Sequence, residues 1–211
     1  AAGLMGIKPA ARTTCVKPAG TTSLTFGTSS GIHAWHNDYY IRRIRVGKNE
    51  AIYEYLAQIH PELVEDEFFR PHDTAVISAP QKAPEGAILR TESALELLER
   101  VKTVSSQWIR TGHRSGQNSH NVSATIAIKD EEWDLVGEWM WENRKFYNGL
   151  SVLPYDGGSY TQAPFEDCDK ETYDKMMESL QSVDLSNVIE MQDDTNLSGE
   201  LACAGGACEI K

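Results

Sequence analysis

Three segments of the chain space their apolar residues at intervals of three and four, as an amphipathic helix does. They are residues 49–60, 93–110 and 170–181. In the second segment, Ser93 and Glu96 form a capping-box pattern, and we expect Trp108 on the apolar face. A fourth helix is expected after Asp130, whose side chain would cap its first turn.

Other segments show the alternation, or the short apolar run between turns, that is typical of strands. We expect strands at residues 73–80, 86–90, 122–128 and 150–154. Residues 13–26 alternate weakly, which predicts a strand that enters and leaves a turn at residues 18–20. From residue 182 onward the periodicity is lost and the sequence is acidic, which is typical of a linker.

Residues 32–46 interleave aromatic residues with three arginines, Arg42, Arg43 and Arg45. One interpretation is a partly buried helix or strand whose arginines extend their charged ends to solvent. The other is a surface that faces an anion or another subunit. We favour the partly buried element.

The net charge of the chain and its uneven distribution limit the classes of partner that the chain could bind. The 211-residue chain is 40% hydrophobic, enough for a folded core, and its net charge of −11 argues against a nucleic-acid partner. Residues 1–48 hold seven Lys and Arg against one Asp, whereas residues 163–211 hold three Lys against twelve Asp and Glu. The N-terminal part is therefore the better candidate to face anions such as nucleotide phosphates.

The sequence shows no sign of a membrane or secreted protein. It contains no apolar run of membrane-spanning length and no recognisable signal peptide, and its four cysteines are irregularly spaced. We therefore expect a cytoplasmic protein without a membrane partner. His33 and His36 are three residues apart, as ligands on a helix can be, but no neighbouring residues complete a set, so we expect no metal site.

The segment from Cys15 to His33 carries the first candidate chemistry. It combines Lys17, a Pro-Ala-Gly turn and three hydroxyls, and a second polar run from Gly27 to Gly31 follows. The amides and hydroxyls could hold an anion, with Lys17 as a point charge, although the pattern is not that of a Walker loop. The alternative is two polar turns that flank a short strand.

Two further segments carry candidate chemistry. Residues 112–121 form a polar loop before an expected strand, which is either a site or an ordinary surface loop. Near the end of the sequence, Cys203 and Cys208 are separated by Ala-Gly-Gly-Ala, a flexible spacing that suits thiol–disulfide exchange. Half of a zinc site and two idle thiols are the alternatives. Cys168 lies among acidic residues, which are expected to raise its pKa.

Together these features resemble the C-terminal part of an adenosylcobalamin-dependent (class II) ribonucleotide reductase. The resemblance covers about residues 12–181 and the tail, and it rests on KPAGTTSLTFGTSSGIH, GHRSGQNSHNVSATI, YNGLSVLPYDGGSYTQAPFE and CAGGAC. It implies an α/β fold in which residues 1–181 are the C-terminal part of a ten-stranded α/β barrel of the reductase type. Residues 182–211 would then be a flexible acidic linker and a redox-active cysteine tail.

The resemblance also implies a function. The family converts ribonucleotides to deoxyribonucleotides for DNA synthesis by radical chemistry that starts from adenosylcobalamin. The residues that would bind the substrate phosphates are Lys17, Pro18, Ala19, Gly20, Thr21, Thr22 and Ser23. Cys203 and Cys208 would re-reduce the active-site disulfide and be recharged by thioredoxin or a similar dithiol reductant.

The sequence departs from the family at the catalytic finger loop. The family's Asn-Pro-Cys-Gly-Glu motif is absent, and neither Cys15 nor Cys168 has the sequence context to replace it. The upstream parts of the reductase are missing too, and the chain begins without Met. We therefore expect the chain alone to be inactive and to need an upstream reductase chain or segment, as a split-gene product, an intein remnant or a truncation would.

Two other functions stay open. The first is a non-catalytic nucleotide-binding fragment. The second is the C-terminal part of a class I reductase large subunit, which also ends in a cysteine pair but needs a separate radical subunit. The sequence from Lys17 to His33 is more similar to the cobalamin-dependent group.

Overall fold

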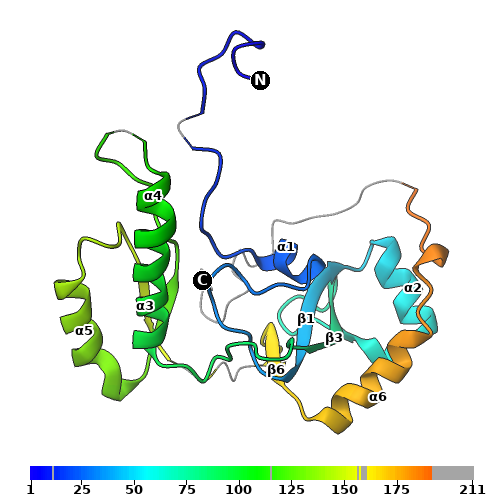
Figure 1. The fold of residues 1–211 in the computed structure, drawn as a ribbon. Coiled ribbons are helices and arrows are strands. Elements are labelled where there is room, and N and C mark those ends of the chain that lie inside the picture. Colours follow the sequence, from blue (N-terminus) through cyan, green and yellow to red (C-terminus); the bar gives the residue numbers. More distant parts are fainter. Residues whose placement is uncertain (11, 115, 156, 158–160, 192–211) are drawn as a thin grey trace. The chain divides into compact units, whose positions relative to one another are not determined.

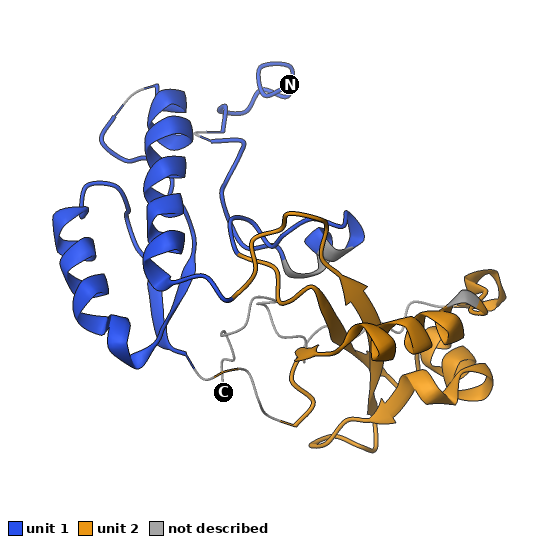
Figure 2. Ribbon diagram, turned by 60° about the horizontal axis from the view of Figure 1, so that its bottom comes forward, with its two compact units in different colours: residues 1–33, 91–155 blue, residues 34–90, 156–211 orange. Residues whose placement is uncertain are grey.

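The structure is a computed structural model that describes residues 1–10, 12–114, 116–155, 157 and 161–191 (Figure 1). The chain forms two compact units, each built from two separate stretches of sequence (Figure 2). Unit 1 combines residues 1–33 and 91–155, and unit 2 combines residues 34–90 with the chain from residue 156 onward. Every helix among the described residues is too short or too polar to cross a lipid bilayer.

Unit 1 contains a pair of parallel strands. β4 (Thr125–Ile128) and β5 (Ser151–Pro154) pair with Thr125 opposite Ser151, and α5 (Trp133–Glu142) lies between them in sequence. Parallel strands need such a crossover, because a short turn cannot return the chain to the same end of the sheet. The other elements of unit 1 are α1 (Gly20–Thr25), α3 (Ala94–Val104), the π-helical turn η2 (Ser105–Ile109), α4 (Arg110–Gly112) and the 3₁₀ turn η3 (Asp130–Glu132).

The core of unit 1 forms where α3 and α5 pack their apolar side chains against the strands. At the start of α3 the Ser93 hydroxyl accepts a hydrogen bond from Glu96 N, and the Glu96 carboxylate accepts one from Ser93 N. The predicted capping box is thereby confirmed. The buried core residues are Ala94, Leu97, Leu98, Val101, Ile109, Val122, Ala124, Ile126, Ile128, Val136 and Trp139.

The π-helical turn corrects the expected position of Trp108. In η2 the N–H of Arg110 bonds to the carbonyl of Ser105, five residues earlier, which adds one residue to the turn. One residue rotates an α-helix by about 100°. Ile109 therefore takes the core position that the sequence assigns to Trp108: Ile109 is 4% exposed, whereas Trp108 is 59% exposed.

Unit 2 is built on an antiparallel sheet with the strand order β2-β3-β1-β6. The central strands, β1 (Tyr39–Gly47) and β3 (Thr74–Lys82), pair along their whole length, and β2 (Val64–Asp66) and β6 (Phe165–Asp167) form the edges. The helix α6 (Lys170–Gln181) packs against β1 and β3. The other elements are α2 (Ala51–Ile59) and the 3₁₀ turns η1 (Pro61–Leu63) and η4 (Leu185–Asn187).

Most of the predicted elements are confirmed. The three segments with helical spacing correspond to α2, to α3 with the two turns that follow it, and to α6, and three of the expected strands correspond to β3, β4 and β5. Residues 86–90 contribute a single bridge, between Trp35 and Leu89, instead of a strand. The fold is mixed α/β, as expected, and the strands of the described residues do not close into a barrel.

Candidate functional site

The candidate phosphate segment, residues 17–23, begins beside a strand-like contact in unit 1. Val16 bridges in parallel to Val122, and the Val16 carbonyl accepts a 3.0 Å hydrogen bond from Ser123 N. This contact fixes the start of the segment to the chain that leads into β4.

Beyond its turn the segment is helical, so the strand expected up to residue 26 is wrong. Gly20–Thr25 form α1, and Phe26 N donates to Thr22 O at 3.2 Å. Threonine favours strands in general, but that preference depends on side-chain packing against neighbouring strands. Here the local hydrogen bonds of the backbone determine the conformation.

The candidate phosphate-binding residues differ in how far their side chains are exposed to solvent. Lys17 and Thr22 are exposed and therefore accessible to an anion. Ser23 is only 6% exposed, and its hydroxyl donates to the Ala19 carbonyl, so this hydroxyl stabilises the turn. The remaining candidates are half-buried or contribute backbone to α1: Pro18, Ala19, Gly20 and Thr21.

The second polar run packs Gly31 against the backbone of Lys17. Gly31 has a φ of +60°, and a Cβ at this position would lie 2.8 Å from the Lys17 carbonyl oxygen. Gly27 also has a φ of +60°, but no atom lies within 4 Å of a Cβ there. The two glycines therefore share a backbone conformation and differ in their contact with the candidate phosphate segment.

We expect Gly31→Ala to lower the free energy of unfolding of unit 1 by about 1–3 kcal/mol more than Gly27→Ala does. Both substitutions carry the cost of a left-handed backbone, about 1–2 kcal/mol. The difference between them therefore isolates the contact with Lys17. Urea denaturation of the two variants measures it, and equal losses would contradict the contact.

In the second polar loop, residues 112–121, His113 forms hydrogen bonds within unit 1. Arg12 Nη2 lies 2.7 Å from His113 Nδ1 and 3.0 Å from Asn118 O. The other ring nitrogen of His113 lies 2.7 Å from the Gly116 carbonyl oxygen. These contacts favour an ordered connecting loop over a loop that presents His113 to a ligand.

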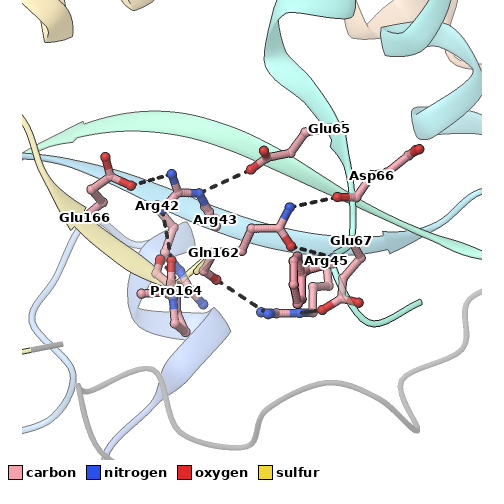
Figure 3. A network of polar contacts seen from close by, with 11 residues as sticks. Arg42, Arg43, Arg45, Glu65, Asp66, Glu67, Gln162, Pro164 and Glu166 are labelled. Atoms are coloured by element: carbon pink, nitrogen blue, oxygen red, sulfur yellow. Dashed lines mark hydrogen bonds and ion pairs between the residues drawn. The ribbon is translucent and has the colours of Figure 1, made fainter. Parts of the chain in front are cut away.

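Two arginines of β1 attach the edge strands of unit 2 to its sheet (Figure 3). Arg43 forms ion pairs with Glu65 of β2, at 3.4 Å, and with Glu166 of β6. Arg42 lies over the ring of Phe165, 4.6 Å from its centroid. The partly buried element expected here is confirmed as a strand, although these arginines contact other residues of unit 2 and not solvent alone.

The third arginine of β1, Arg45, contacts a buried carboxylate (Figure 3). Arg45 Nε lies 3.4 Å from Glu67 Oε1, and Glu67 is only 5% exposed. The other carboxylate oxygen of Glu67 accepts hydrogen bonds from Phe69 N, at 2.7 Å, and Arg70 N, at 2.6 Å. Arg45 also donates to the carbonyl of Gln162 at 3.5 Å. This carboxylate therefore organises the turn that follows β2.

A polar cluster in unit 2 is not predicted by the sequence. His36 Nε2 lies 3.1 Å from Asp167 Oδ1, and Arg90 Nη2 lies 2.8 Å from Asp167 Oδ2. Burial of the ring, reinforced by the Arg90 charge and opposed by Asp167, lowers the pKa of His36 to about 4. The three residues come from distant parts of the chain, so no local pattern reveals them. His33, in contrast, belongs to unit 1.

The cysteines divide into two described thiols and the tail pair. Cys15 is exposed, and burial together with the neighbouring acidic residues raises the pKa of Cys168, in the predicted direction. Cys203 and Cys208 lie outside the described residues. The part of the chain that the structure describes contains no group of three or more His, Cys, Asp or Glu side chains that could hold a metal ion.

No protein-family model matches the chain. Known proteins are nevertheless similar to it in sequence and in fold. The adenosylcobalamin-dependent ribonucleoside-triphosphate reductases of Lactobacillus delbrueckii subsp. bulgaricus and Lactobacillus leichmannii are each 30% identical to it over 219 residues. These alignments cover 98% of this chain and 28% of each relative. A crystal structure of a B12-dependent (class II) ribonucleotide reductase matches with a TM-score of 0.67 and 28% identity, over 89% of this chain and 25% of that chain.

This chain is homologous to a part of the adenosylcobalamin-dependent ribonucleotide reductases. The resemblance found in the sequence is thereby confirmed, and the α/β fold matches that of a class II ribonucleotide reductase. The chain spans just over a quarter of the length of the reductases that it matches, 28%. The two units therefore correspond to one section of a much larger reductase.

Proposed function

We propose that this chain is part of a ribonucleotide reductase that converts ribonucleotides to deoxyribonucleotides for DNA synthesis. In this proposal it supplies the loop for the substrate phosphates, residues 17–23, and the tail dithiol, Cys203 and Cys208. Homology to adenosylcobalamin-dependent reductases over 98% of the chain is the observation that carries the proposal. Since the chain covers 28% of a relative, an upstream reductase chain or segment would supply the rest.

The geometry of residues 17–23 supports a phosphate-binding role. Lys17 precedes α1 and Thr22 lies within it, and both side chains are exposed. The first N–H groups of any α-helix lack partners within that helix, so the backbone at the start of α1 can also donate hydrogen bonds. A cation, hydroxyls and clustered N–H donors are the groups that phosphate oxygens accept hydrogen bonds from.

The proposed cofactor is adenosylcobalamin, which the names of the relatives specify for those enzymes. Its bound form would supply the radical that starts the reaction. Both ring nitrogens of His33 and of His113 are engaged in hydrogen bonds within unit 1, so these imidazoles do not fit a cobalt ligand. We assign no residue of this chain to the cofactor and propose that the upstream segment binds it.

The tail would act as a dithiol that transfers two electrons to an active-site disulfide. The thiolate of one tail cysteine attacks that disulfide, and the other tail cysteine resolves the mixed disulfide. The active-site thiols are then both reduced, and Cys203 and Cys208 form a disulfide. Thioredoxin or a similar dithiol reductant would reduce this disulfide for the next turnover.

Formation of deoxyribonucleotide in the presence of adenosylcobalamin tests the proposal, by the chain alone and by the chain mixed with the upstream segment. Turnover in the mixture only would support a reductase that is assembled from parts. No turnover in either sample would contradict it and favour the second candidate, a nucleotide-binding fragment without catalysis. The absence of the finger-loop motif from the sequence favours that candidate for the chain alone.

We expect Lys17→Gln to weaken the binding of inorganic tripolyphosphate to the chain by about tenfold, because a charge-assisted hydrogen bond is lost. Isothermal titration calorimetry measures the affinity. Lys8→Gln is the matched control, since it removes the same charge from another exposed position of unit 1. Equal affinities for Lys17→Gln and Lys8→Gln would count against the phosphate loop.

A further inference from the structure

The backbone that follows the second polar run is held by a half-buried arginine of α3. Arg100 Nη1 donates to the Ile32 carbonyl oxygen at 2.8 Å. The same guanidinium binds the Glu92 carboxylate with both of its terminal nitrogens, at 3.2 and 2.5 Å. The Glu92 side chain is 10% exposed and that of Arg100 is 22% exposed. This bidentate pair fixes the guanidinium in the orientation that reaches Ile32.

The next residue, His33, connects the same backbone to β4. His33 Nε2 lies 3.1 Å from Thr125 N, and because an amide N–H can only donate, this ring nitrogen must be the acceptor. The ring is therefore neutral, and its Nδ1–H donates to the Ser30 carbonyl oxygen at 2.9 Å. Burial of the ring lowers the pKa of His33, which favours this neutral form, with Arg100 reinforcing and Glu92 opposing the shift.

Ser30 links these contacts to the candidate phosphate segment. Its carbonyl oxygen accepts from the His33 ring, and its hydroxyl oxygen accepts a 3.1 Å hydrogen bond from Ala19 N. Gly31, the next residue, packs against the Lys17 carbonyl. A continuous set of contacts therefore runs from α3 and β4, through residues 30–33, to the turn that carries Lys17.

We propose that His33 and Arg100 are positioning residues that hold the phosphate loop in its binding shape. Neither side chain has to contact the substrate, because both act on the backbone of residues 30–33. This inference rests on the proposed function, since it assumes that residues 17–23 bind phosphate. A binding loop whose shape is fixed in advance loses less conformational entropy when the ligand arrives, which strengthens binding.

Tripolyphosphate affinity of the whole chain tests this inference. We expect His33→Phe to weaken binding by about tenfold, since two hydrogen bonds to the ring are lost. His33→Gln keeps an acceptor for Thr125 N and should recover part of the affinity. Arg100→Lys keeps the charge beside Glu92 but not the planar fork that also reaches Ile32, so it should weaken binding too. The control is His60→Phe, which replaces a buried histidine of unit 2 and leaves the residues of unit 1 unchanged. This variant should bind tripolyphosphate as the wild type does.

Hydrogen exchange at the Ala19 amide separates positioning from a general loss of stability. In His33→Phe this amide should exchange faster, whereas the Ile126 amide in β4 should change less. Unchanged exchange at Ala19, or unchanged affinity in His33→Phe, would overturn the inference while leaving the phosphate loop in place. A wild-type chain that fails to bind tripolyphosphate would contradict the phosphate loop itself, and with it the functional part of this inference.

Discussion

Replacing both Cys203 and Cys208 by serine is expected to abolish thioredoxin-driven turnover by the assembled reductase. Under the proposed function, electrons from thioredoxin reach the active-site disulfide only through these two thiols, and serine can neither attack a disulfide nor form one. A small dithiol that enters the active site directly should still support turnover by the variant. Deoxyribonucleotide formation with each reductant in turn measures the effect.

Cys168→Ser is the matched control for the tail variant. Cys168 is half-buried, and its raised pKa disfavours the reactive thiolate, so its replacement should leave thioredoxin-driven turnover unchanged. Full thioredoxin-driven turnover by the tail variant would remove the dithiol role. Loss of turnover with both reductants would also contradict it, because the defect would then lie in the active site.

A large loss of stability is also expected for Glu67→Ala, which should destabilise unit 2 by about 3 kcal/mol. The substitution leaves the Arg45 guanidinium without its buried partner. It also removes the oxygen that accepts hydrogen bonds from Phe69 N and Arg70 N. Native-state hydrogen exchange of the amides of β1 and β3 measures the change.

Glu65→Ala provides the comparison for Glu67→Ala. Glu65 also pairs with an arginine of β1, at the same 3.4 Å, but its side chain is 47% exposed. An exposed ion pair contributes at most about 1 kcal/mol, so this variant should be nearly as stable as the wild type. Similar losses in the two variants would show that burial of Glu67 does not determine its contribution.

Elements whose ends are set by neighbouring residues could be predicted from the sequence. The capping box of Ser93 and Glu96 marks the start of α3. At the start of α6, the Asp169 carboxylate accepts a hydrogen bond from Thr172 N, again within one turn. In these cases the contacts that determine the boundary lie within three or four residues, where a sequence pattern can record them.

The sequence was less informative where distant residues decide the outcome. Whether Trp108 or Ile109 enters the core depends on a π-helical turn, which the spacing of apolar residues does not predict. Residue types identified the candidate phosphate segment, but they could not show that the Ser23 hydroxyl is used inside the turn. Nor could they show that His33 and Arg100 support that segment, because their partners depend on the fold.

The division of each unit between two stretches of sequence has a consequence for synthesis on the ribosome. The chain passes between the units three times, so neither unit emerges as one uninterrupted piece. Both strands of the β4-β5 pair in unit 1 have been synthesised once β5 is made, but the sheet of unit 2 still lacks β6 at that moment. The edge of β1 that pairs with β6 therefore stays unpaired at a stage when β4 and β5 can already pair. In a nascent chain that edge stays uncovered until residues 165–167, which form β6, have been synthesised.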